Sequence, residues 1–209
     1  YVLNLMKNNQ FDTIYHEHYS YLSFTAVCNI FDFNGLAVFD VEQIPTHGGS
    51  LRVYVQLRAS GSYKVNTNVV DLLEKEDRAG LNSINTYRGF QEQAEDIKNN
   101  FLSFLIKTKN NGHSVVGYGA AAKGSTLLNF SGVRPDLLPY VVDKSDAKKD
   151  KFMPGSRVPI MSETQLKKDK PDYIVIFPWN IQDEVIEQLA YIREWGGKFV
   201  IFIPSMRVI

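Results

Sequence analysis

The sequence has a single cysteine and no excess of charge of either sign. Cys28 alone, among 209 residues, excludes an internal disulfide and a cysteine-rich zinc site within the chain. Lysine plus arginine and aspartate plus glutamate number 23 each, so no overall field attracts nucleic acid or an anionic membrane. No apolar run reaches the roughly 18 residues of a membrane span. We therefore expect a cytoplasmic protein that holds any anionic ligand by local geometry.

Residues 1–58 resemble the end of a domain more than a whole one. The chain begins at Tyr1 with apolar residues, without an initiator methionine or a polar lead-in. Regular spacing of apolar residues predicts a helix and two strands, over residues 23–33, 36–44 and 50–57. One helix and a hairpin cannot cover both faces of a sheet. We therefore expect the beginning of this larger fold to be missing.

Residues 59–112 are interpreted as a linker and connecting helices. We expect one amphipathic helix within the polar stretch 59–82 and a longer helix over about 84–109. The apolar stripe of the longer helix consists of Ile97, Phe101, Phe104 and Leu105. Two asparagines and a glycine at 110–112 end this helix.

From residue 113 onward, short apolar strands alternate with helices. The expected strands are 114–119, 138–143, 159–160, 172–178 and 198–203. The expected helices are 123–130, 163–168 and 182–195. Strands that are apolar throughout and separated by helices indicate a parallel sheet covered by helices on both faces. The sequence therefore predicts an α/β fold, with a Rossmann-like domain over residues 113–209.

Residues 15–21, YHEHYSY, concentrate groups that move protons. Every side chain in this segment except Ser20 can titrate or polarise a proton. Imidazole titrates near neutral pH, a carboxylate can orient it, and a phenol can donate to a developing oxyanion. The segment therefore indicates proton-transfer chemistry. A surface loop of satisfied polar groups is the alternative.

A second candidate site is the glycine turn at residues 117–122, GYGAAA. It fits the pattern G-x-G-x-x-A and stands between a predicted strand and a predicted helix. Small residues let the backbone approach a pyrophosphate, and the N–H groups of the helix start point at its oxygens. The predicted contacts come from Gly117, Gly119, Ala121, Lys123, Gly124 and Ser125. In the alternative interpretation, the glycines and alanines only allow tight packing of helix on strand.

Further residues are candidates for substrate binding. Asp143 ends the next strand, 24 positions after Gly119, where such folds place a carboxylate for a sugar hydroxyl. His47 and Arg52, on the hairpin, are suited to a phosphate or sugar, although an ordinary hairpin explains them equally well. Trp179, after a strand end, is placed either to stack on a ring or to close the core.

Five segments together resemble one known family. They are residues 15–21, 47–52, 117–125, 141–144 and 177–180. In this order and spacing they resemble the S-adenosylmethionine-dependent sugar C-methyltransferases that act on dTDP-linked keto-deoxysugars, and the resemblance covers nearly the whole chain. It implies that residues 1–58 end a class I methyltransferase domain. The zinc module and the S-adenosylmethionine loop of that family are absent here, so we expect the chain alone to be inactive.

The resemblance also implies roles for individual residues. His18 is the general base that removes the proton next to the sugar ketone, and Tyr15 donates to the enolate oxygen. Glu17 orients the site or binds the sugar. The loop from Gly119 to Ser125 holds the pyrophosphate. Because deoxythymidine lacks a 2′-hydroxyl, Asp143 either contacts the 3′-hydroxyl or makes no contact with the nucleotide.

Two other classes of protein are compatible with parts of the sequence. The glycine turn and Asp143 also suit a nicotinamide-dependent oxidoreductase, NAD(P) being its cofactor. Lys123, directly after the turn, and the reactive segment a hundred residues earlier argue against that class. A non-catalytic nucleotide-binding module is the third interpretation, and the abrupt start of the chain favours it.

Overall fold

The chain folds into two units in the computed structural model, which describes residues 1–209. The first unit contains residues 1–10 and 17–92, and the second contains residues 11–16 and 93–209. Residues 11–16 therefore belong with the second unit although they stand early in the chain. The assignment of residues 1–58 to the end of a methyltransferase domain, of 59–112 to linking helices and of 113–209 to a nucleotide-sugar-binding domain stays a prediction.

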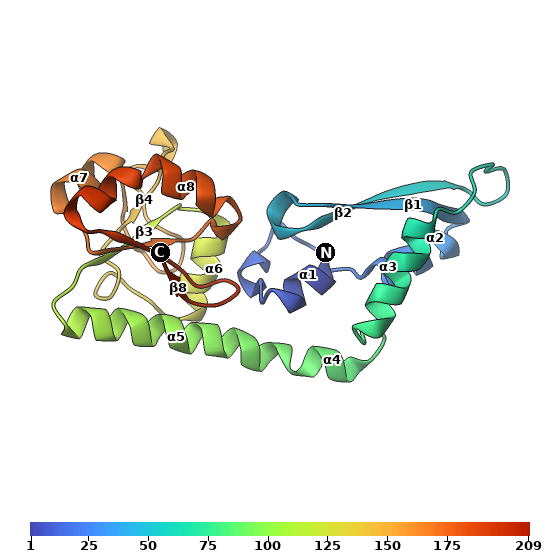
Figure 1. Ribbon diagram of the computed structural model, residues 1–209, viewed down its shortest axis with the longest axis horizontal. Coiled ribbons are helices and arrows are strands. Elements are labelled where there is room, and N and C mark those ends of the chain that lie inside the picture. Colours follow the sequence, from blue (N-terminus) through green and yellow to red (C-terminus); the bar gives the residue numbers. More distant parts are fainter. The chain divides into compact units, whose positions relative to one another are not determined.

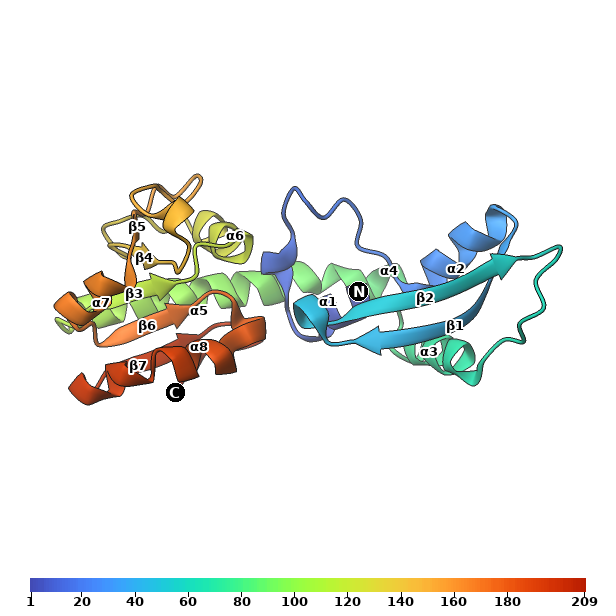
Figure 2. The same cartoon turned by 90° about the horizontal axis from the view of Figure 1, so that it is seen from above.

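The first unit is a long β-hairpin packed on helices (Figures 1 and 2). Its elements are α1 Val2–Lys7, α2 Phe24–Phe33, β1 Leu36–Ile44, β2 Ser50–Leu57, α3 Thr67–Arg78 and α4 Ile84–Arg88. The two strands pair antiparallel, and α2 and α3 pack against β1 and against each other. Their shared core contains Phe24, Val41, Val69 and Leu72. The predicted helix over 23–33 and both predicted strands are confirmed.

A carboxylate from α3 holds the beginning of α2. Glu76 is completely buried, and its Oε1 accepts a hydrogen bond from the Phe24 N–H at 2.6 Å. Its Oε2 accepts from the N–H of Thr25 at 2.8 Å and from the Thr25 hydroxyl at 2.7 Å. The Ser23 hydroxyl caps a third N–H, that of Ala26. The first-turn N–H groups, which have no partner inside a helix, are thus satisfied here by side chains.

The second unit is a six-stranded sheet with helices on both faces, the Rossmann-like α/β fold predicted from the sequence. Its strands are β3 Val115–Tyr118, β4 Val141–Val142, β5 Ile160–Met161, β6 Tyr173–Ile176, β7 Lys198–Ile201 and β8 Arg207–Val208. Its helices are α5 Phe90–Asn110, which begins in the first unit, α6 Ala122–Phe130, α7 Glu163–Asp169 and α8 Gln182–Gln188. The strand order is β5-β4-β3-β6-β7-β8, parallel except for β8.

Alternate residues of the strands face opposite helical layers. Val116 and Ile174 point into a core shared with Leu166 of α7 and Leu189 after α8. On the other face, Phe101 of α5 packs edge-on against Phe202. Figure 1 shows α7 and α8 on one side of the sheet and α5 and α6 on the other. None of the helices combines the length and the apolar character that crossing a membrane requires.

The structure corrects several predicted element boundaries. The long helix expected over 84–109 is broken at Gly89 into α4 and α5. The helix expected over 182–195 ends at Gln188 and continues as a 3₁₀ helix over Ala190–Trp195. The strand expected over 138–143 is reduced to β4, because Pro139 lacks the N–H that a sheet needs. The antiparallel edge strand β8 was not predicted.

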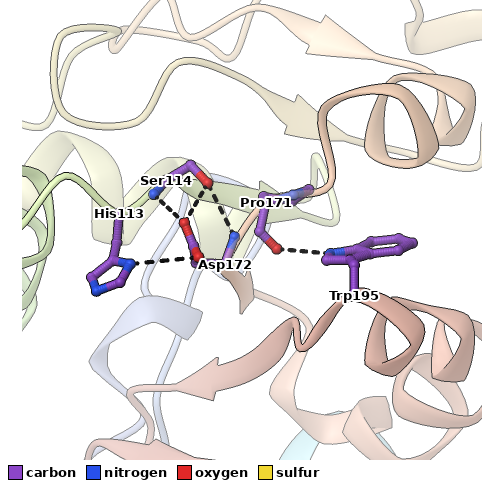
Figure 3. A network of polar contacts seen from close by, with 5 residues as sticks. All are labelled: His113, Ser114, Pro171, Asp172 and Trp195. Atoms are coloured by element: carbon purple, nitrogen blue, oxygen red, sulfur yellow. Dashed lines mark hydrogen bonds and ion pairs between the residues drawn. The ribbon is translucent and has the colours of Figure 1, made fainter.

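A polar network joins the amino ends of the neighbouring strands β3 and β6 (Figure 3). Asp172 accepts hydrogen bonds from the N–H and the hydroxyl of Ser114, and the Asp172 N–H donates to the same hydroxyl. His113 Nδ1 lies 3.5 Å from the other oxygen of Asp172. Hydrogen bonds from Ser114, together with His113, hold the pKa of Asp172 below its usual value. Trp195 donates to Pro171 O at 3.1 Å. This network holds the two central strands together at the edge opposite to the glycine turn.

We expect Asp172→Asn to destabilise the second unit by about 1 kcal/mol at pH 7, because an amide accepts weaker hydrogen bonds than a carboxylate. The pKa of Asp172 is lowered from 3.8, so its contribution exists above pH 3.8 and disappears as the pH falls through the lower, folded-state pKa. The difference between variant and parent should therefore shrink in acid. Urea unfolding followed by tryptophan fluorescence measures it, and the exposed Asp136→Asn is the control. An equal decrease in the free energy of unfolding of Asp172→Asn and Asp136→Asn would contradict the prediction.

Candidate functional site

The carboxyl ends of β3 and β6 form a topological switch point of the sheet. β3 is the first strand of this sheet in the chain and lies in its middle, between β4 and β6. The chain leaves β3 through α6 toward β4 on one side, and later returns through α7 to β6 on the other. Figure 2 shows β3, β6 and β7 side by side. Open parallel sheets bind ligands at the carboxyl edge where the connections diverge in this way.

The glycine turn after β3 packs tightly against the segment after β6. Gly119 has a φ of +94°, and a Cβ atom on it would lie 2.4 Å from Pro178 Cδ. A Cβ on Gly117 would lie 2.6 Å from the Phe177 ring, and one on Gly124 would lie 2.9 Å from the same ring. Close packing therefore requires glycine at all three positions. The packing alternative accounts for these glycines, and a diphosphate contact at the same turn stays a prediction.

The first turn of α6 has features that suit an anion. Its N-cap is Ala121, which offers no side-chain hydrogen bond, and the hydroxyl of Ser125 turns back to Ala121 O at 3.4 Å. The N–H groups of Ala122, Lys123 and Gly124 have no acceptor inside the helix. Uncapped N–H groups and the positive end of the helix dipole are favourable for a phosphate.

Lys123 is buried at the start of this helix. Its Nζ lies 5.4 Å from the centroid of the Trp179 ring, a cation–π contact. Burial lowers the pKa of Lys123, and the charge of Asp12 acts in the opposite direction. Two residues predicted from the sequence, Lys123 and Trp179, are thus brought together at the switch point.

Asp12 completes this cluster, and sequence reasoning missed it. Its Oδ2 accepts a hydrogen bond from Trp179 Nε1 at 2.8 Å. Only 2% of Asp12 is exposed, and burial raises its pKa to about 7, against the opposing effects of the Trp179 hydrogen bond and the Lys123 charge. The only signal in the sequence was the position of Asp12, three residues before Tyr15.

The segment containing Asp12 packs on α6 within the second unit. Residues Phe11–Thr13 form a 3₁₀ turn, and the Phe11 ring lies 5.2 Å from the Phe130 ring, centroid to centroid. The Thr126 hydroxyl donates to Ile14 O at 3.4 Å. Tyr15 and His16 follow in the same unit. The beginning of the YHEHYSY segment is therefore attached to the helix that carries Lys123.

The rest of that segment belongs to the first unit. Glu17 is exposed there, and His18 is half-buried, with its ring 6.3 Å from the Tyr21 ring in an edge-on arrangement. Tyr19 is 95% exposed. The catalytic roles of His18, Tyr15 and Glu17 stay predictions.

Asp143 is engaged inside the protein. Its Oδ2 accepts from the Ala120 N–H at 2.8 Å and from Lys148 Nζ at 3.0 Å, and its Oδ1 accepts from the Ser145 N–H at 2.8 Å. A carboxylate has about four acceptor positions, so these three bonds leave little capacity for a ribose diol. These bonds fix the glycine turn to the end of β4, and a substrate contact from Asp143 stays a prediction.

The two substrate-binding candidates of the hairpin, His47 and Arg52, lie at different places in the first unit. Arg52 is opposite Glu42 in the register of β1 and β2, and the two form an exposed ion pair at 2.9 Å. His47 is exposed in the turn Thr46–Gly48, with a φ of +54°. The ordinary-hairpin alternative accounts for Arg52. A substrate contact from either residue stays a prediction.

Comparison with known proteins identifies two similarities. A family model of the C-methyltransferase C-terminal domain matches residues 45–204. Over 209 residues, the chain is also 37% identical to the C-methyltransferase NovU of Streptomyces niveus. That match takes in the whole chain and 50% of the relative, so the chain spans about half the length of the curated relative it matches. The family match contains every predicted substrate-binding residue, and the match to NovU also covers residues 15–18.

Proposed function

Because the chain belongs to the C-methyltransferase C-terminal domain family, we propose that it binds the substrate and removes its proton in an S-adenosylmethionine-dependent C-methyltransferase. The substrate of the proposal is a dTDP-linked keto-deoxysugar, methylated at a carbon next to its ketone. The proposed location is the cytoplasm.

One observation carries the proposal: within the second unit, the residues just before the YHEHYSY segment are attached to α6, the helix whose first turn suits a diphosphate. Asp12, Lys123 and Trp179 meet at the switch point of the sheet. Tyr15 follows Asp12 by three residues in the same unit. A diphosphate bound at the first turn of α6 would therefore lie in the unit that also carries Tyr15.

The proposed chemistry of this chain is proton removal. His18 takes the proton from the carbon next to the ketone, and Tyr15 donates a hydrogen bond to the oxygen as the enolate forms. Glu17 orients these groups or binds the sugar. A carbon acid of this kind becomes nucleophilic only when its enolate is stabilised as the proton leaves.

S-adenosylmethionine supplies an electrophilic methyl group when it is bound to a methyltransferase domain. The glycine turn of this chain does not suit its adenosine, because three protein hydrogen bonds already engage Asp143. We therefore assign no residue of this chain to that cofactor. No group of three or more His, Cys, Asp or Glu side chains is placed to hold a metal ion, and the proposed zinc module lies outside these residues.

Isothermal titration of the 209-residue chain with dTDP, NAD and AMP tests the proposal. We expect dTDP to bind and NAD and AMP to give no measurable heat, because Asp143 has little remaining capacity to accept hydrogen bonds from a ribose diol. Selective binding of NAD would favour the oxidoreductase interpretation and contradict the proposal. Binding of all three with similar constants would indicate a general nucleotide-binding module.

Lys123→Ala is expected to weaken dTDP binding by about tenfold and to make it less sensitive to salt, because a charge-assisted contact is lost. The control is Lys98→Ala, since Lys98 also lies over an aromatic ring, that of Phe130, at 5.3 Å. The control should bind dTDP like the parent. An unchanged dissociation constant for Lys123→Ala would place the diphosphate elsewhere.

A further inference from the structure

Asp12 is a buried carboxyl group that the proposed chemistry does not use. Its Oδ2 is bonded to Trp179, whereas its Oδ1 is buried and has no hydrogen-bond partner on another residue. An unsatisfied buried polar atom costs about 1–3 kcal/mol. An apolar side chain of similar size would pack at this position without that cost. The carboxyl group therefore has a role beyond packing.

Trp179 connects Asp12 to Lys123. Its indole N–H donates to the carboxyl group, and its ring faces the ammonium group of Lys123. The ring cannot turn without losing one of these two contacts. The charge of Asp12 also favours the protonated form of Lys123, which burial disfavours. The contact of Asp12 with the lysine is thus made through the indole.

The turn that carries Asp12 also fixes the chain that leads to Tyr15. Phe11 packs on Phe130, and Ile14 O accepts from Thr126, so the chain is attached to α6 on both sides of Asp12. One short segment therefore sets the orientation of the indole and the starting point of the YHEHYSY segment.

We propose that Asp12 is a positioning residue for the nucleotide diphosphate. It holds the Trp179 indole, and through it the Lys123 ammonium group, in the geometry that receives the diphosphate of the substrate. This inference rests on the proposed function. Asp12 itself contacts neither the nucleotide nor the reacting carbon.

A matched pair of variants, Asp12→Asn and Asp12→Leu, tests the positioning role. Both keep the branched shape of aspartate and both remove the charge, asparagine at nearly the same size and leucine with bulkier methyl groups. Only asparagine keeps an acceptor for the indole N–H. In titrations of the 209-residue chain with dTDP, we expect Asp12→Asn to bind within about threefold of the parent and Asp12→Leu about tenfold more weakly. Equal affinities of the two variants would overturn the proposal.

Trp179→Phe tests the same hydrogen bond from the other side, and it decides the question if Asp12→Leu does not fold. Phenylalanine keeps an aromatic ring under Lys123 but has no N–H donor. We expect the single variant to lose about tenfold in dTDP affinity and the double variant with Asp12→Leu to lose no more, because both remove one interaction. Parent-like binding by Trp179→Phe, or additive losses, would overturn the proposal.

A fluorescence measurement separates this inference from the proposed function. The chain has two tryptophans, so Trp195→Phe leaves Trp179 as the only one. In that background and without ligand, we expect Asp12→Asn to keep the parent emission maximum, and Asp12→Leu to shift it and increase quenching by acrylamide. Identical spectra would overturn the positioning role. If the parent does not bind dTDP, the proposed function fails, while the spectra still decide whether Asp12 holds the indole.

Discussion

His18→Asn is expected to abolish the exchange of the sugar's alpha hydrogen with deuterated solvent. Removing a general base slows proton transfer by about 10²–10⁴-fold, because no other group then takes the proton as the enolate forms. Affinity for the nucleotide should remain near that of the parent, since the predicted diphosphate contacts lie in the second unit. Proton NMR of the dTDP-linked keto-sugar in D₂O measures the exchange, in a protein that joins this chain to a methyltransferase domain.

The neighbouring histidine provides the control for this experiment. His16 lies two positions earlier in the same segment and is exposed. His16→Asn changes the same kind of side chain, and we expect it to leave exchange within about threefold of the parent, since it has no assigned role as base. If His18→Asn exchanges at the parent rate, another residue is the base. If both variants lose exchange, the segment as a whole has been disturbed, and the assignment to His18 fails.

Local patterns in the sequence were sufficient to predict much of the fold. The strands β1 and β2 have the predicted boundaries, because alternating apolar residues and the glycine-containing turn between them are local signals. Helix α2 follows its Ser23 cap, and Gly35 comes after it with a φ of +74°. The parallel sheet was predictable because its strands are apolar throughout and separated by helices.

Features that depend on distant contacts could not be predicted from the sequence. Asp12 and Trp179 are 167 positions apart, and no periodicity links them. Residues 11–16 belong to the second unit because Phe11 packs on Phe130, a contact with no sequence signal. Strand β8 has two residues, too few for any alternation to show, and only its partner β7 defines it.

In the candidate site, some features could be predicted from the sequence and others could not. Lys123 and Trp179 were each recognised from local context, at a helix start and a strand end, and the structure brings them together. The position of Asp143 at the end of β4 was predicted from the sequence, but its hydrogen-bond partners were not. Its bonds to Ala120 and Lys148 depend on loops whose conformation no local pattern specifies.

Glu76→Ala is expected to be the most destabilising substitution in the first unit. Glu76 accepts three hydrogen bonds at the start of α2, and its loss would leave the N–H groups of Phe24 and Thr25 without partners beside a fully buried ring. We expect the free energy of opening α2 to fall by about 3 kcal/mol, since each buried unsatisfied donor costs about 1–3 kcal/mol. Hydrogen-exchange mass spectrometry of α2 peptides measures this as roughly hundredfold faster exchange.

A neighbour on the same helix separates the capping role from a general effect on α3. Glu74 is exposed and lies 3.9 Å from Arg78 one turn later, a pair worth only a few tenths of a kcal/mol. Glu74→Ala should therefore leave exchange in α2 nearly unchanged. Comparable exchange in both variants would mean that water replaces the carboxylate at the start of α2. A loss confined to Glu76→Ala would show that a buried carboxylate on α3 holds the start of α2, which begins three residues after the YHEHYSY segment.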